Sequence, residues 1–384
     1  MTNKEKLNDN LPIIVTFILC IALFLLPTGF EGALIRDGAE RVKSTVLETD
    51  DSQIKDTGLV RSGEQSCLVR LESGSFKGQT FNAANILSGS LEQDAIYTEG
   101  DSALVLVSQA GGAVSSVSMI DHYRIEKEAV LAAAFFLFLI AFAGKTGIRA
   151  ILSFILTLLA IWKMLIPLCL KGFDPLIAGG VMSCALTILI IALVYGFDKR
   201  CLAACIGAIT GLSATAAMGI AATCGLKIHG AVMAYSESLL YSGYQSLNLT
   251  RIFMASIFIG SSGAMMDLAV DITSAVHEVL QKRPDLSRKE AIRSGMNVGR
   301  AAMGTMTTTL LLAYSGGFIA LLMVFMAQGT PIINILNYKY VSSELIHTIV
   351  GSFGLVTVAP LTAAASGYIL AKGGKINKPH SLIE

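Results

Sequence analysis

The sequence contains little charge, and the charge that it does contain is balanced. Only 15% of its 384 residues are Asp, Glu, Lys or Arg, whereas 53% are hydrophobic. An ordinary soluble domain carries charge on about a quarter of its residues, so this composition argues strongly against a water-soluble globular enzyme. The 29 basic and 28 acidic residues give a formal net charge of +1. Because no basic excess is available to attract phosphates, no nucleic-acid partner is expected.

Sequence motifs typical of nucleotide-driven or metal-dependent enzymes are also absent. Residues 144–146 (Gly-Lys-Thr) look like the end of a phosphate-binding loop, but Leu139 stands where the first glycine is required. Residues 277–278 (His-Glu) begin like a zinc-protease helix, but Gln281 stands where the second His is required. We therefore expect no catalytic residues, and any energy source must be an ion gradient or a separate subunit.

The seven cysteines lack the spacing of a redox or metal site. None forms a C-x-x-C pair, and six of them lie in apolar runs. Cys67 is the only cysteine in a polar stretch, so it has no disulfide partner nearby. Cys201 and Cys205 are one helical turn apart, but no His or carboxylate accompanies them in that run. The sequence therefore predicts no metal and no cofactor.

Long apolar runs dominate the chain. A helix needs about 20 apolar residues to cross a bilayer, and runs of that order lie at 11–30, 128–144, 148–170, 175–196, 201–222, 251–274, 302–327 and 344–371. Clusters of Lys and Arg occupy every second joint, which places both termini in the cytoplasm by the positive-inside rule. The prediction is a mainly α, polytopic helix bundle with about eight transmembrane helices, in the plasma membrane.

Composition shifts divide the chain into four parts. Residues 1–30 read as an uncleaved anchor helix, and residues 373–384 as a cytoplasmic tail. Residues 31–127 alternate short polar and apolar stretches with glycine-containing turns, which indicates a small extracytoplasmic β-domain, an OB-like or SH3-like barrel. This domain is a spacer or a partner-docking module. Residues 128–372 form a seven-span membrane domain, in which residues 223–250 are either re-entrant or a surface-lying amphipathic helix.

One predicted span carries polar side chains along a single face. Steps of three and four residues place these positions on the same side of a helix: Gly260, Gly263, Asp267, Asp271, Ser274 and Glu278. A carboxylate inside the membrane costs a few kcal/mol unless it is paired or hydrated. We therefore predict a proton or cation relay through a buried Asp on this span, and the candidate relay residues are Asp267, Asp271 and Glu278.

The next span supplies possible partners for these carboxylates. Arg300 enters the membrane from the cytoplasmic side and is expected to reach Asp271 or Glu278. Polar lining is expected from Ser274, Asn297, Thr305, Thr307 and Thr308. Two interpretations remain open, because the same side chains suit an ion relay and a structural lock that joins the two helices through hydrogen bonds.

Several segments of the second half resemble the YibE/F-like bacterial membrane proteins. The resemblance rests on residues 263–272 (GAMMDLAVDI), 294–300 (SGMNVGR), 303–307 (MGTMT), 312–316 (LAYSG) and 351–355 (GSFGL). It implies a multi-pass membrane protein with a small β-domain after one anchor helix, in a family without an assigned activity. The chain departs from the family pattern at Thr308, where Asn is expected, and at His347, where Arg is expected. Our reading of His347 is a hydrated residue at the membrane surface.

A fainter similarity concerns the RND and SecD/SecF proteins. Those proteins also combine an Asp-bearing helix of small residues, a basic linker and a span with adjacent threonines, here Thr307 and Thr308. The similarity implies a proton-driven exporter in which Asp267 or Asp271 titrates. The leading hypothesis is therefore a secondary transporter or exporter that moves a small substrate or ion. The alternative is a non-transporting membrane scaffold or accessory subunit whose β-domain docks a partner and whose polar stripe is structural. Candidate partners in either case are a second copy of the chain, as a homo-oligomer, or another protein.

Overall fold

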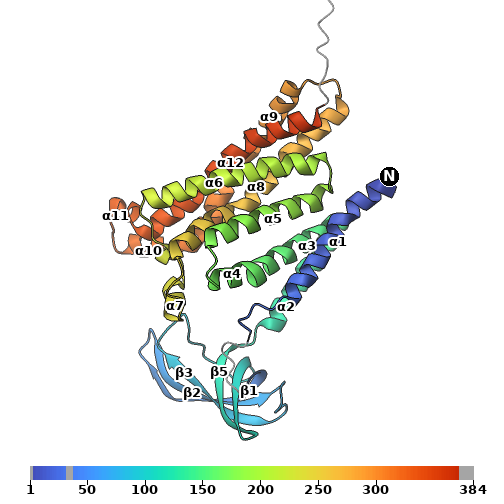
Figure 1. Cartoon of the computed structure of the whole chain (residues 1–384). Coiled ribbons are helices and arrows are strands. Elements are labelled where there is room, and N and C mark those ends of the chain that lie inside the picture. Colours follow the sequence, from blue (N-terminus) through green and yellow to red (C-terminus); the bar gives the residue numbers. More distant parts are fainter. Residues whose placement is uncertain (1–2, 32–37, 372–384) are drawn as a thin grey trace, which may run out of the picture. The chain divides into compact units, whose positions relative to one another are not determined.

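The computed structural model describes residues 3–31 and 38–371 of the chain. Two compact units make up the protein (Figure 1): Phe30–Gly144, the barrel unit, and Met1–Gly29 with Lys145–Glu384, the helical unit. The predicted cytoplasmic tail, residues 373–384, lies outside the described residues. Most of the chain is helical, and the strands are confined to the barrel unit, as the sequence predicts.

The barrel unit contains five strands in a closed barrel. They are β1 (Ala39–Asp56), β2 (Arg61–Leu71), β3 (Thr80–Ser88), β4 (Ser102–Ala110) and β5 (Ala113–His122). Their order is β1-β2-β3-β5-β4, and every pair is antiparallel except β3 with β5. The long strand β1 pairs with both β2 and β4, so the closed barrel leaves no strand edge open.

Alternation along the strands builds the barrel core. Val42 and Val46 on β1, with Cys67 and Val69 on β2, point inward and are almost fully buried, as period-two side-chain geometry requires. The pairing of β1 with β2 shifts register near Gly63, whose φ is +114°. A Cβ at that position would collide with a backbone carbonyl of β1, so only glycine fits there.

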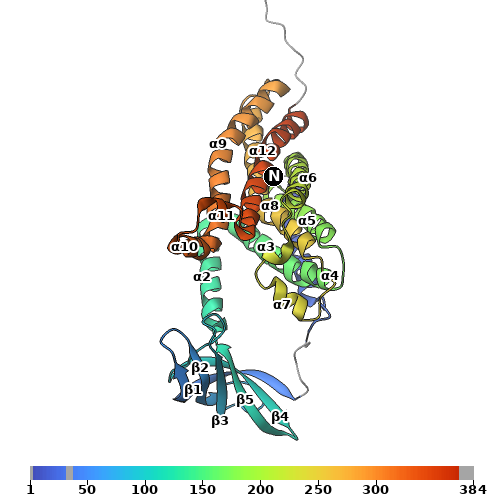
Figure 2. The ribbon, with the colours of Figure 1, turned by 90° about the vertical axis from the view of Figure 1, so that its left-hand side faces the viewer.

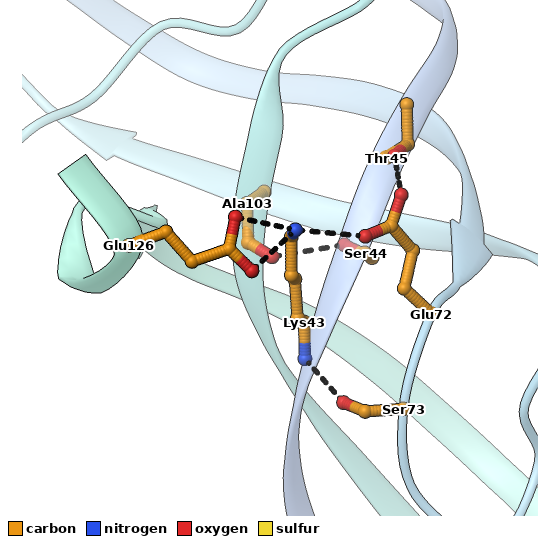
Figure 3. Close-up of polar contacts among 7 residues, drawn as sticks. All are labelled: Lys43, Ser44, Thr45, Glu72, Ser73, Ala103 and Glu126. Carbon is orange, nitrogen blue, oxygen red and sulfur yellow. Dashed lines mark hydrogen bonds and ion pairs between the residues drawn. The ribbon is translucent and has the colours of Figure 1, made fainter. Parts of the chain in front are cut away.

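Helix α2 (Ile125–Ala143) belongs to the barrel unit, and one ion pair joins its first turn to strand β1. Figure 3 shows the Lys43 ammonium of β1 between two carboxylates, with Nζ 2.9 Å from Glu126 Oε1 and 3.0 Å from Glu72 Oε2. Hydrogen bonds to Glu126 and then to Glu72 raise the pKa of Lys43. These contacts attach the first turn of α2 to the barrel surface, whereas the rest of α2 is apolar and buries no residue.

The helical unit begins with α1 (Asn3–Leu25) and contains six segments that are long and apolar enough to cross a membrane. Those segments are Lys145–Leu170, Pro175–Tyr195, Lys199–Gly225, Leu249–Lys282, Arg288–Ala327 and Lys339–Leu370. The first combines α3 (Lys145–Leu159), a π-helical segment and α4 (Ile166–Leu170); the next three are α5, α6 and α8. The fifth joins α9 (Arg288–Ser315) to α10 (Ile319–Ala327), and the last is α12.

Eight spans were expected, and the count of eight is not confirmed. The apolar part of α1 covers only Asn10–Leu25, and α2 has 19 residues with a charged first turn. The apolar part of α1 is shorter than the roughly 20 residues of a span, whereas α2 has the length of a span but carries charge in its first turn. The structure therefore supports a membrane protein with six candidate spans, and the first two predicted spans, which correspond to α1 and α2, are not among them.

Local sequence signals determine where the long helices begin. The side chains of Asp174 and Asp198 accept backbone N–H bonds at the starts of α5 and α6, and Asn248 does so at the start of α8. Ser287 and Glu290 form a reciprocal capping box at the start of α9. These caps satisfy N–H groups that have no partner within the helix.

Helix α12 is the central element of the bundle. It packs against α6, α8 and α9, and Figure 2 shows it between α9 and α6. Small residues allow this close approach: a Cβ on Gly207 would meet Thr362, and a Cβ on Gly211 would meet Val358. The buried core of the unit includes Leu268, Ile272, Leu355 and Val358, each fully shielded from solvent.

Residues 223–250, predicted to be re-entrant or amphipathic, form two short pieces. A single 3-10 turn (Gly230–Val232) and the six-residue α7 (Ser236–Tyr241) lie between α6 and α8. Val232 packs against Phe253 of α8 and Ile346 of α12, so the segment covers one end of those helices. No helix long enough to lie along a membrane surface exists among the described residues of this segment.

Candidate functional site

The polar positions predicted on α8 share one face of that helix. Gly260, Gly263, Asp267, Asp271, Ser274 and Glu278 are all exposed. Between them, Leu268, Ile272 and Val276 are fully buried on the opposite side. The period of 3.6 residues therefore separates α8 into an apolar face in the core and a polar face on the surface of the unit. We call this surface the α8 polar face.

The prediction of a buried aspartate is not supported. Among the described residues, the buried polar side chains are Ser, Thr, Asn and Gln, and none is charged. The aspartates of α8 are exposed because α9 covers the apolar side of α8 and leaves the polar side open. A Cβ on Gly295 would lie 2.8 Å from Val276 Cγ2, and one on Gly299 would lie 3.0 Å from Ile272 Cδ1. Glycine contacts, and not polar ones, join these two helices.

The polar side chains predicted on α9 also face outward. Asn297, Arg300, Thr305 and Thr308 are exposed, and Thr307 is half-buried. The threonine hydroxyls donate to carbonyls one turn earlier in the same helix, at 2.9–3.3 Å for Thr307 and Thr308. They therefore make no bond that would lock α9 to α8.

Within the described part of the chain, Arg300 forms no ion pair with either predicted carboxylate. Glu278 instead pairs with Lys282 on its own helix, at 2.7 Å. Ser274 shares a 2.6 Å hydrogen bond with the hydroxyl of Tyr195, which also donates to the Val270 carbonyl. This contact anchors the end of α5 beside the α8 polar face.

Exposed carboxylates on a membrane-spanning helix would raise its free energy of insertion. A charged side chain at the centre of a bilayer costs about 2.5–3.5 kcal/mol on insertion scales. Asp267 and Asp271 lie in the middle of a 34-residue helix that is apolar enough to span a membrane. Their exposure to lipid tails would therefore be costly, so the α8 polar face must be hydrated or covered by another protein chain.

A second site, which the sequence did not predict, lies where α8 begins. A pocket of about 440 Å³ opens between α8, α9, α12 and the 3-10 turn, and its walls include Phe253, Tyr314, Phe318, Tyr340, Glu344 and His347. His347 was expected to be a hydrated surface residue. Its ring instead packs against Phe253 at 5.0 Å and against Tyr314 at 5.4 Å between centroids.

Three polar atoms at this pocket are buried and make no hydrogen bond to any described residue. They are the hydroxyl of Tyr314, Oε1 of Glu344 and Nδ1 of His347. The spacing of Glu344 and His347 places them on one face of α12 and was visible in the sequence. Nothing in the sequence links them to Tyr314, which is 30 residues earlier, so only the tertiary packing brings the three together.

Metal chemistry has no obvious site in the described residues. No group of three or more His, Cys, Asp and Glu side chains there could hold a metal ion. Cys201 and Cys205 lie 3.9 Å apart through their sulfur atoms and are both free and buried. They line an apolar hollow of about 600 Å³ between α5 and α6, with Ile188, Leu202 and Ile206.

Comparison with known proteins identifies a family. A protein-family model described as "YibE/F-like protein" matches residues 131–372, which is more than half of the chain. No curated protein matches, and no solved structure matches. The matched region contains both the α8 polar face and the pocket at the start of α8.

Proposed function

For this chain, which belongs to the YibE/F-like family, we propose the function of a secondary transporter or exporter coupled to protons or cations. It resides in the plasma membrane with both termini in the cytoplasm, and it is not an enzyme. The α8 polar face is the coupling element in this proposal. The observation that carries it is the exposure of Asp267 and Asp271 in the middle of an otherwise apolar span.

The carboxylates on α8 have a spacing that suits a relay. Asp267, Asp271 and Glu278 lie along one face over about three turns, and the rise of about 1.5 Å per residue separates the first and last by about 16 Å. That length is about half of the hydrocarbon core. A proton or cation that moves along this row would cross the cytoplasmic half of the membrane.

The outward face of α9 carries polar side chains that are not bonded to the carboxylates of α8 in this structure. Asn297 and Thr305 are exposed, and Arg300 is not paired with Asp271 or Glu278. A charge that is free in one conformation can bind a carboxylate in another, and protonation of that carboxylate then shifts the balance between the two. We expect Arg300 to act in this way.

Proton flux into proteoliposomes tests the proposal. With a pH-sensitive dye inside the vesicles and an imposed gradient, the wild type should carry protons or counter-transported cations. Asp267→Asn should abolish the flux while leaving the protein folded, and Asp267→Glu should restore part of it. Asp285→Asn is the matched control, because Asp285 lies in the loop after α8 and, among the described residues, forms its ion pair with Arg283 alone. Its flux should equal that of the wild type.

The alternative function is a scaffold whose barrel unit docks a partner. Its support is the division of the chain into two compact units, one of which consists of the barrel and α2. A wild type without flux, combined with a stable partner that co-purifies only when the barrel unit is present, would favour the scaffold. Flux that is unchanged in Asp267→Asn would reject the relay role of this residue.

A further inference from the structure

The pocket at the start of α8 has the composition of a ligand site. Four aromatic rings line it, from Phe253, Tyr314, Phe318 and Tyr340. Its volume of about 440 Å³ lies in the range of small-molecule sites, about 300–1,000 Å³. Such sites combine mostly apolar walls with a few convergent polar groups, and this pocket has that combination.

The polar groups of the pocket lack partners within the protein. Buried polar atoms are almost always hydrogen-bonded, because desolvation without a partner costs free energy. Here three such atoms belong to side chains that line one cavity: Tyr314 Oη, Glu344 Oε1 and His347 Nδ1. A ligand that brings its own donors would satisfy them together.

The charged residues in the pocket wall indicate which class of ligand the pocket binds. Glu344 is the only acidic residue of the walls, and no Lys or Arg is among them. An anion would find no counter-charge, whereas a cation would meet one carboxylate and several ring faces that attract positive charge. A bare metal ion would find only one carboxylate and one imidazole, fewer ligands than metal ions ordinarily take from a protein.

We propose that this pocket binds a small organic ammonium ion, with the cationic nitrogen beside Glu344 and its alkyl groups against Phe253, Tyr314 and Tyr340. A hydroxyl or amine group on the ligand would bond to Tyr314 and His347. The proposal goes beyond ion coupling at the α8 polar face, because it requires neither flux nor Asp267.

The position of the pocket makes it accessible from water. Phe253 is four residues from the first residue of α8, and Glu344 is five residues from the first residue of α12. At a rise of about 1.5 Å per residue, both side chains lie within about 8 Å of the helix ends. A water-soluble cation can therefore reach the site without crossing the hydrocarbon core.

Calorimetric titration of the full chain in lipid nanodiscs tests the proposal. The probes are choline, tetramethylammonium and the neutral isostere of choline in which carbon replaces the nitrogen. Wild-type protein should bind choline saturably and at least about tenfold more tightly than the isostere, since tenfold corresponds to the loss of a single charge-assisted contact. If the wild type does not bind choline saturably, or binds the isostere as tightly as choline, the proposal is wrong. This result needs no variant protein.

Three variants locate the site. Glu344→Gln should weaken binding of choline and tetramethylammonium by about tenfold or more. Tyr314→Phe keeps the ring and removes the hydroxyl, so it should weaken choline and leave tetramethylammonium unchanged. Glu237→Gln is the matched control, because Glu237 on α7 is exposed and does not line the pocket. If folded Glu344→Gln bound choline as tightly as the wild type, the assignment would be wrong.

Discussion

The packing of α9 offers a quantitative test, because two of its glycines have opposite surroundings. Gly295 faces α8 and α12, where an added Cβ would lie 2.8 Å from Val276 Cγ2 and 3.2 Å from Ala363 Cβ. Gly304 is exposed on the same helix, and an added Cβ would meet nothing within 4 Å. Replacing each glycine by alanine therefore adds the same methyl group to one closed site and one open site.

The expected free energies follow from two opposing effects. Alanine in a helix interior is more favourable than glycine by about 1 kcal/mol, and both variants gain this propensity. Gly295→Ala also overpacks the contact with Val276, and insertion of a methyl into a packed core costs about 1–3 kcal/mol. Gly304→Ala should thus be stabilised by up to about 1 kcal/mol. Gly295→Ala should be less stable than Gly304→Ala by about 1–3 kcal/mol.

Unfolding from mixed micelles with increasing SDS, followed by circular dichroism, measures both free energies. The comparison reports which side of α9 faces the core, and hence whether Arg300 and Asn297 point away from α8. Equal stability of the two variants would refute the orientation of α9. A larger loss in Gly304→Ala than in Gly295→Ala would imply that α9 is rotated, with its polar side against α8.

Two further predictions concern the barrel unit. Burial raises the pKa of the Cys67 thiol to about 11. Maleimide at neutral pH should therefore modify exposed Cys224 and leave Cys67 unmodified until the barrel unfolds. Comparable labelling of both cysteines in the native protein, measured by mass spectrometry, would contradict the burial of Cys67 in the barrel core. Hydrogen bonds from Ser88, Gly89 and Ser90 lower the pKa of Asp94 in the folded state. The ionised carboxylate therefore stabilises the turn at any pH above the unfolded pKa of about 3.9. This stabilisation is lost as the pH falls through the lower pKa of the folded state. Asp94→Asn should therefore speed hydrogen exchange of residues 88–90 near neutral pH, with a difference from the wild type that shrinks in acid; a difference that is independent of pH would contradict the role of the charge.

Periodicity in the sequence was sufficient for the main features of the fold. Alternation of apolar residues in strands such as residues 103–107 predicted the β-domain, and apolar length predicted the six candidate spans that the structure contains. The same reasoning also predicted two spans at the N-terminal side that the structure does not confirm, because the apolar part of α1 is short and the first turn of α2 is charged. Length and composition alone do not separate a short apolar helix from a span.

The exposure of the α8 polar face could not be derived from its period. A step of three or four residues places Asp267 and Asp271 on one face, but it does not say whether another helix covers that face. The spacing of Ala291, Gly295 and Gly299 was the available signal, since small residues four apart mark a close helix contact. The structure buries all three, which turns Arg300 outward.

The central claim is that the α8 polar face is hydrated within the membrane. Gly263→Cys places a thiol on this face at an exposed position with nothing within 4 Å. Val181→Cys is the comparison, because Val181 on α5 is 61% exposed in an apolar helix. With a membrane-impermeant thiol reagent and site-resolved mass spectrometry of proteoliposomes, Gly263→Cys should be labelled and Val181→Cys should not. Failure to label Gly263→Cys, or equal labelling of both, would contradict a hydrated path along α8.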